Sequence, residues 1–231
     1  CKGRRKWKCS IGKKIGTRYQ WMNDEIEEKW FVIKEYVRPD RIEAGTFLCG
    51  AVITRGRVKV TQMIPEHISA VLDLFRDIGC EVTTGDTWVE VDARNKTLKP
   101  VSAVTLPYPG FPTDLQAPLM ATLASIEGNS LLQDTIYHDR FTHIAELKRL
   151  GADIQLNGNT ATILGGKPLE GADVMASDLR ASAALVLAGL IAEGETTISR
   201  IYHLDRGYEN FESKMAALGA TVKRIRPQAF D

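Results

Sequence analysis

The sequence predicts an α/β fold built from three related units, and two observations lead to this prediction. An aspartate followed by an Ala-rich apolar run and a closing glycine occurs three times at nearly constant spacing, as Asp40 to Gly56, Asp114 to Gly128 and Asp178 to Gly194. Each copy is followed by a second helix-like stretch that also ends in glycine, at Gly79, Gly151 and Gly219. Because self-similarity at a fixed period is the signature of repeated structural units, we expect three units that pack together. Their three aspartate-headed helix starts can then converge.

Each unit is expected to run helix, strand, helix and then a pair of strands. In the first unit we expect these elements at residues 40–53, 57–61, 65–78, 80–84 and 87–92. Asp40 suits the first helix start, because its carboxylate can accept a bond from an unpaired backbone N–H at the positive helix end. Residues 57–61 alternate in polarity, which is typical of a strand. Gly79 can take the positive φ with which many helices end.

The second unit repeats this pattern, but the third stops short. Residues 153–156 and 160–164 predict a hairpin around Asn157-Gly158, which is a strong turn signal. In the third unit residues 221–225 predict a single strand, and Pro227 follows where the other units have a second strand. A strand without that partner would leave an exposed edge. Repeat symmetry therefore predicts that another segment supplies the partner, and residues 30–37 are the obvious local candidate.

Composition describes an ordinary globular chain. Of 231 residues, 44% are hydrophobic and 26% are charged, and the formal net charge is +1, which is typical of soluble domains and predicts no strong field over the whole surface. The sequence shows no signal peptide and no apolar run of about 18 residues or more, so we predict no membrane span and a cytoplasmic location. The cysteines and histidines lack metal-ligand spacing, so we expect neither a metal site nor a cofactor.

The first 23 residues are strongly basic and contain no acidic residue. Because this stretch also lacks periodicity and does not belong to the repeat, we divide the chain into a basic leader, residues 1–36, and a domain over residues 37–231. We expect the leader to be disordered or non-native. The alternative is an arm that binds nucleic acid through its cations and interleaved aromatic residues, which we do not favour.

A Pro-rich segment, residues 107–114, leads into the second aspartate-headed helix. It ends with Thr113 and Asp114, and both residue types suit a helix cap. One interpretation is a stiff loop that ends in an N-cap. The other is a carboxylate at the mouth of a cleft, placed to take a proton from a substrate hydroxyl. The residues alone leave both interpretations open.

Three acid–arginine pairs stand at expected helix entrances: Asp139 with Arg140, Asp178 with Arg180, and Asp205 with Arg206. Helix N-termini and guanidinium groups both suit phosphate or carboxylate. One such pair is usually a surface ion pair of little consequence, but three in equivalent places favour convergence on a multiply charged anion. The chain has no glycine-rich phosphate loop, and no Ser-His-Asp or Cys-His pairing stands out.

These segments resemble the UDP-N-acetylglucosamine 1-carboxyvinyltransferase family, the enolpyruvyl transferases that open bacterial peptidoglycan synthesis. The matching motifs are PDRIEAGTF at 39–47, FPTDLQ at 111–116, DRF at 139–141, DLRASA at 178–183 and IYHLDRGYE at 201–209. The likeness runs from about residue 37 to residue 225 and covers only the C-terminal half of the family's usual length. The sister family, enolpyruvyl-shikimate-phosphate synthase, shares the fold but differs at these motifs.

The resemblance implies an inside-out α/β barrel-like domain of three repeated units, the enolpyruvyl transferase fold, with the third unit incomplete. It also implies the activity: the enolpyruvyl group of phosphoenolpyruvate moves to the 3′-hydroxyl of UDP-N-acetylglucosamine, and phosphate leaves. Finally, it implies roles for six residues, namely Asp114 as the catalytic base on that hydroxyl, Ile136 against the UDP-sugar, Arg140 and Arg206 on phosphoenolpyruvate, and Asp178 and Arg180 along the same pocket.

The family's other half has no visible counterpart here. In the family an N-terminal domain supplies a catalytic loop, usually with a cysteine as general acid, together with a lysine-asparagine pair and further arginines. We therefore expect that a complete site needs this missing N-terminal domain as a partner. Two alternatives stay open: a truncated, inactive fragment that at most binds ligand weakly, and the nucleic-acid-binding module described above.

Overall fold

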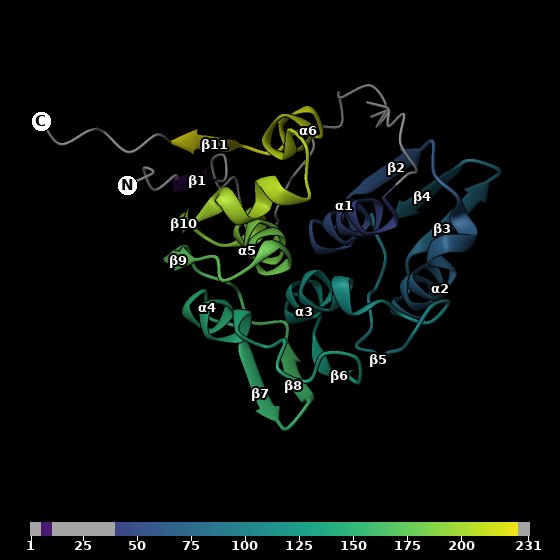
Figure 1. Cartoon of the computed structure of the whole chain (residues 1–231), viewed down its shortest axis with the longest axis horizontal. Helices are drawn as coiled ribbons and strands as arrows, with labels where there is room; N and C mark the ends of the chain where they lie inside the picture. Colours follow the sequence, from purple (N-terminus) through teal and green to yellow (C-terminus); the bar gives the residue numbers. More distant parts are fainter. Residues whose placement is uncertain (1–5, 11–39, 226–231) are drawn as a thin grey trace, which may run out of the picture.

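The computed structural model describes residues 6–10 and 40–225, and it arranges three α/β units around three central helices. The central helices are α1 (Arg41–Ile53), α3 (Gln116–Ala124) and α5 (Leu179–Ile191). They occupy the middle of Figure 1, and the three β-sheets lie around the outside. The prediction of three repeated α/β units is therefore confirmed, and the layers are inverted relative to a fold with a central sheet.

The first unit follows the expected order of elements. After α1 come β2 (Arg57–Thr61), the short 3-10 helix η1 (Pro65–Ile68), α2 (Ser69–Ile78), β3 (Glu81–Gly85) and β4 (Trp88–Asp92). The sheet has the order β2-β4-β3, and both pairings are antiparallel. Asp40 caps α1, because its Oδ1 accepts a bond of 2.8 Å from the N–H of Ile42. Gly79 ends α2 with φ of 105°, as predicted.

The second unit adds one strand that the sequence did not predict. Its elements are η2 (Thr113–Leu115), α3, β6 (Gly128–Asp134), α4 (His143–Arg149), β7 (Asp153–Asn157) and β8 (Thr160–Gly165). In addition, β5 (Ser102–Thr105) pairs in parallel with β6, which gives a sheet of order β5-β6-β8-β7. The segment that connects the first two units is thus part of the sheet.

The third unit repeats the arrangement. It contains β9 (Asp173–Met175), α5, β10 (Glu195–Ser199), η3 (Ile201–Arg206), α6 (Phe211–Ala217) and β11 (Val222–Ile225). Strand β9 pairs in parallel with β10, as β5 does with β6. Asp178 caps α5 by accepting bonds of 2.8 and 2.9 Å from the N–H groups of Arg180 and Ala181.

The partner strand that repeat symmetry predicts is present, and it comes from the basic segment. Strand β1 (Lys6–Ser10) lies between β10 and β11 and is antiparallel to both. Strands β4 and β8 hold the equivalent central places in the other two sheets. The third unit is therefore complete among the described residues, and the expectation of a leader apart from the repeats is wrong for residues 6–10. Residues 30–37, the other candidate, lie outside the described residues.

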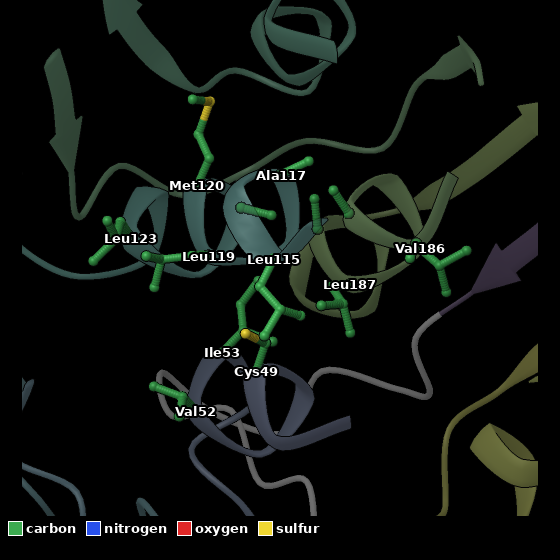
Figure 2. Packing of buried hydrophobic residues seen from close by; sticks show 14 of the residues in the cluster. Cys49, Val52, Ile53, Leu115, Ala117, Leu119, Met120, Leu123, Val186 and Leu187 are labelled. Atoms are coloured by element: carbon green, nitrogen blue, oxygen red, sulfur yellow. The ribbon is translucent and has the colours of Figure 1, made fainter. Parts of the chain in front are cut away.

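The core lies where the three central helices meet. Figure 2 shows buried side chains of all three helices in the region between them, among them Leu115 at the start of α3, Cys49 and Ile53 of α1, and Leu187 of α5. All four of these side chains are at most 2% exposed. Nearly every residue of α1, α3 and α5 is buried, as expected for helices that are apolar on all sides. Each of them is enclosed by its neighbours and by the surrounding sheets.

Helices α1 and α3 run in the same direction. Near their starts, α1 passes so close to Leu115 that a Cβ at Gly45 would overlap the leucine side chain. Near their ends, Nη2 of Arg55 donates a bond of 2.9 Å to the carbonyl of Ser125, the residue that follows α3. Contacts at matching ends establish a parallel pair, so the N-termini of both helices lie at one end of the bundle.

Replacing Gly165 by alanine is expected to destabilise the fold. Gly165 ends β8 against the last turn of α3, where an added Cβ would overlap the carbonyl oxygens of Leu123 and Ile126. Because these are backbone atoms, the strand or the helix must move, and overpacking of this kind costs about 1–3 kcal/mol or more. The free energy of unfolding in urea measures the effect.

Gly50→Ala is the matched control, since its added Cβ would lie 3.4 Å from Cδ2 of Leu187, an ordinary contact. Alanine inside a helix is favoured over glycine by about 0.5–1 kcal/mol, so this variant should be as stable as the parent or more so. Equal stability of both variants would contradict the close approach of β8 to α3.

Candidate functional site

The N-terminal ends of the central helices bring together three of the arginine and aspartate residues singled out from the sequence. Nη1 of Arg140 lies 2.5 Å from Oδ1 of Asp114, and Nη2 of Arg180 lies 3.1 Å from Oδ2 of the same carboxylate. Arg180 belongs to the first turn of α5, and Asp114 lies one residue before Leu115 at the start of α3. The start of α5 therefore joins those of α1 and α3 at one end of the bundle.

Asp114 does not cap a helix. It lies within η2, and no side chain caps either η2 or α3. Both of its oxygens bind guanidinium groups from other parts of the chain. The interpretation of this segment as a stiff loop that ends in an N-cap is therefore wrong for Asp114, whose carboxylate points into a cluster of charge.

The two guanidinium groups keep Asp114 ionised. Partial burial by itself raises the pKa of Asp114, but the attraction of Arg180 and the hydrogen bond and charge of Arg140 outweigh it and hold the pKa below 3.8. These ion pairs stabilise the fold fully above pH 3.8, and their contribution is lost as the pH falls through the depressed pKa. The side chains of Asp114 and Arg140 are 36% and 22% exposed, so water and a ligand have access.

Arg180 is the more deeply buried arginine, with a side chain only 10% exposed. Its Cζ lies 5.6 Å from the ring centre of Tyr208, a buried residue just after η3. The hydroxyl of Tyr208 in turn lies 2.8 Å from Oγ1 of Thr46 on α1. Residues of all three units thus hold Arg180 in place, although sequence analysis gave Tyr208 and Thr46 no role.

The acid–arginine neighbours of the sequence do not pair with each other. Arg140 pairs with Asp114 and not with Asp139. Asp205 pairs instead with Arg224 of β11, whose Nη2 lies 2.5 Å from its Oδ1. Helix starts bring residues together from distant parts of the chain, so adjacency in sequence was a poor guide to the ion pairs.

Within the described part of the chain, the remaining predicted site residues form no ion pair with the cluster. Asp178 uses one carboxylate oxygen to cap α5 and accepts a bond of 3.1 Å from Ser177 with the other. Arg206 is exposed at the end of η3, and the next residue, Gly207, abuts Leu179 at the start of α5. Ile136 is 46% exposed on the loop that leads to Arg140. The roles of these residues stay predictions.

The described part of the chain contains neither a recognisable metal cluster nor a helix suited to span a membrane. Residues 6–10 and 40–225 contain no group of three or more His, Cys, Asp and Glu side chains arranged to hold a metal ion. Among the helices of these residues, none has the length and apolar character that a bilayer crossing requires.

Comparison with known proteins gives the class to which this fold and site belong. Residues 25–215 match the family model for EPSP synthase, 3-phosphoshikimate 1-carboxyvinyltransferase, so the chain belongs to this family. The solved enolpyruvyl transferase NikO from Streptomyces tendae superposes with a TM-score of 0.74 at 29% identity, over 82% of this chain and 45% of that one. An EPSP synthase from Acinetobacter baumannii, at 20% identity and a TM-score of 0.65, shares the fold.

Within the family, the chain is similar to proteins named UDP-N-acetylglucosamine 1-carboxyvinyltransferase. It is 52% identical to the one from Hydrogenovibrio crunogenus over 197 residues, 85% of this chain and 47% of the relative. It is 53% identical to the one from Acinetobacter baylyi over 186 residues, 80% of this chain and 44% of the relative. The chain thus spans about half the length of the curated relatives it matches. The resemblance found in the sequence motifs is confirmed.

Proposed function

We propose that this chain forms one wall of the active site of a UDP-N-acetylglucosamine 1-carboxyvinyltransferase. The reaction joins the 3′-oxygen of UDP-N-acetylglucosamine to C2 of phosphoenolpyruvate, while the bond from C2 to the phosphate oxygen breaks and phosphate leaves. One observation carries the proposal: a single carboxylate, Asp114, lies between Arg140 and Arg180 where three helix N-termini meet. The relatives' name supplies the substrates.

The site suits a small, multiply charged anion. Phosphoenolpyruvate carries a carboxylate and a phosphate, and guanidinium groups bind both through paired, charge-assisted hydrogen bonds. The N-terminus of α3, which no side chain caps, adds partial positive charge at the same end. In this proposal Arg140 and Arg180 bind the anion, and the exposed Arg206 is its third arginine ligand. Fixed cations of this kind stabilise negative charge that builds up in a transition state.

Asp114 is the group that would take the proton from the sugar 3′-hydroxyl. In the unliganded chain both of its oxygens are engaged by arginines, which makes it a weak base. Phosphoenolpyruvate would compete for the same guanidinium groups. Once the ligand neutralises them, the burial that raises the pKa of Asp114 acts without their opposition, and its basicity increases. Binding of one substrate thus prepares the base for the other.

We propose that the chain acts in peptidoglycan synthesis in the cytoplasm, and through it in cell-wall biogenesis, cell shape and cell division. Because the chain spans about half of the curated relatives it matches, we propose that turnover needs the N-terminal half as a partner. An enclosed site excludes water from the reacting groups, which one wall cannot do.

Phosphate release from phosphoenolpyruvate and UDP-N-acetylglucosamine tests the proposal. The full chain is assayed alone and after addition of the N-terminal half of a relative. Turnover only in the mixture supports the proposal. Turnover by the chain alone would contradict the need for a partner. Weak phosphoenolpyruvate binding without turnover in either sample would favour the inactive fragment.

A further inference from the structure

A buried carboxylate, Asp134, lies outside the ion-pair cluster and is hydrogen-bonded to the segments that carry it. Asp134 ends β6 and is 0% exposed. It accepts four hydrogen bonds: from the hydroxyls of Thr105 and Thr113 at 2.7 and 2.6 Å, and from the N–H groups of Ile136 and Tyr137 at 3.0 and 2.9 Å. No lysine or arginine of the described residues forms an ion pair with it, so neutral donors alone offset the cost of burying its charge.

The two oxygens of Asp134 hold different parts of the site. Oδ1 accepts from Thr105 and from the backbone of the loop, residues 135–140, that ends in Arg140. Oδ2 accepts from Thr113, the residue next to Asp114. One carboxylate therefore restrains the segments that carry both partners of an ion pair. Burial raises the pKa of Asp134, but these hydrogen bonds outweigh it and keep the group ionised at neutral pH.

Thr113 connects this carboxylate to the cluster. Its hydroxyl donates its one proton to Asp134, so its free lone pairs can accept a bond from another group. Nη1 of Arg140 lies 3.2 Å from this oxygen and 2.5 Å from Oδ1 of Asp114. Thr113 thus donates to Asp134 and accepts from Arg140. The bond from Arg140 to Thr113 helps to hold the guanidinium group against Asp114.

We propose that Asp134 is a positioning residue that sets the contact of Arg140 with Asp114 through Thr113 and the 135–140 loop. Its importance for catalysis rests on the proposed function, since a displaced base or anion ligand lowers the rate. Asp134 itself is too deeply buried to touch substrate. If Asp134 only stabilised the end of its sheet, removing the hydroxyl of Thr113 would leave the ion pair between Arg140 and Asp114 unchanged.

Substitutions at Thr113 separate these two roles. Thr113→Val removes the hydroxyl at nearly constant size, and Thr113→Ser keeps it. In the full chain, a ¹³C NMR titration should show a raised pKa of Asp114 in the valine variant, because Arg140 loses its second acceptor and moves from the carboxylate. The serine variant should titrate like the parent. Thr113→Ala removes the same hydroxyl without a new methyl group and replaces the valine variant if that one does not fold.

Thr122→Val is the matched control, because its buried hydroxyl bonds to Pro118 within α3 and not to the cluster. It should leave the pKa of Asp114 unchanged. Asp134→Asn is a less clear test, since removing a nearby negative charge lowers the pKa of Asp114 while loss of position raises it. An unchanged pKa of Asp114 in both Thr113→Val and Thr113→Ala would overturn the proposal.

Ligand binding separates this proposal from the proposed function. In the mixture with the N-terminal half, Thr113→Val should weaken phosphoenolpyruvate binding by roughly 2- to 10-fold, the value of one hydrogen bond. A raised pKa of Asp114 without any phosphoenolpyruvate binding by the parent supports the positioning role and contradicts the function. Tight binding with an unchanged pKa supports the function and contradicts the positioning role.

Discussion

Asp114→Ala is expected to lower turnover by roughly 100- to 10,000-fold, the range that a positioned general base contributes. The assay is phosphate release in the mixture of this chain with the N-terminal half of a relative. Loss of the carboxylate leaves the sugar hydroxyl without a proton acceptor. Phosphoenolpyruvate binding should persist and can strengthen, because Arg140 and Arg180 lose the internal anion that competes with it.

Asp114→Ala also removes the carboxylate that pairs with Arg180. The buried charge of Arg180 is then poorly compensated, which destabilises the fold. Asp114→Asn keeps the size and part of the hydrogen bonding, and urea unfolding of both variants separates stability from catalysis. Asp153→Ala is the matched control, since that carboxylate, on β7, pairs with Lys167 at 2.6 Å, away from the cluster. Full turnover in a folded Asp114→Asn variant would show that Asp114 is not the catalytic base.

Arg140→Ala is expected to weaken phosphoenolpyruvate binding by roughly 10- to 100-fold, with a smaller effect on turnover at saturating ligand. A hydrogen bond to a charged group contributes about 1.5–3 kcal/mol, and each 1.4 kcal/mol is tenfold in affinity. Arg140→Lys should fall between parent and alanine variant, because an ammonium group keeps the charge but cannot bind two oxygens in the same plane. Titration calorimetry with phosphoenolpyruvate gives the affinities.

Arg149→Ala provides the control for charge alone. Arg149 ends α4, its side chain is 60% exposed, and its Nε lies 4.0 Å from Glu146. Its loss should leave phosphoenolpyruvate affinity unchanged. If Arg140→Ala and Arg149→Ala bind phosphoenolpyruvate equally well, the anion does not bind at the observed cluster.

The local elements of the fold were predictable because their signals are local. The helix cap at Asp40, the glycine that ends α2 and the hairpin of β7 and β8 each follow from a few adjacent residues. Repeat symmetry even predicted that the third sheet needs another strand. The source of that strand was not predictable, because β1 pairs with residues far along the chain and its basic sequence lacks a clear alternation.

The short parallel strands β5 and β9 were missed for a related reason. Each contains three or four residues, too few for a periodic pattern, and each pairs with a strand beyond an intervening helix. The three residues of the ion-pair cluster, Asp114, Arg140 and Arg180, stand in motifs that the sequence singled out. Nothing in the sequence distinguished Asp134, since an acidic residue at the end of a strand is usually exposed, and only the folded loops turn hydrogen-bond donors toward it.

The place of β1 has a consequence for how this chain matures on the ribosome. Among the described elements β1 is synthesised before all others, yet the two strands on either side of it, β10 and β11, are among the last of them to emerge. The third sheet cannot close during translation until β11, residues Val222–Ile225, has left the exit tunnel. Pairings between such distant segments form slowly, so we expect the first two units to be ordered while the third still awaits its final strand.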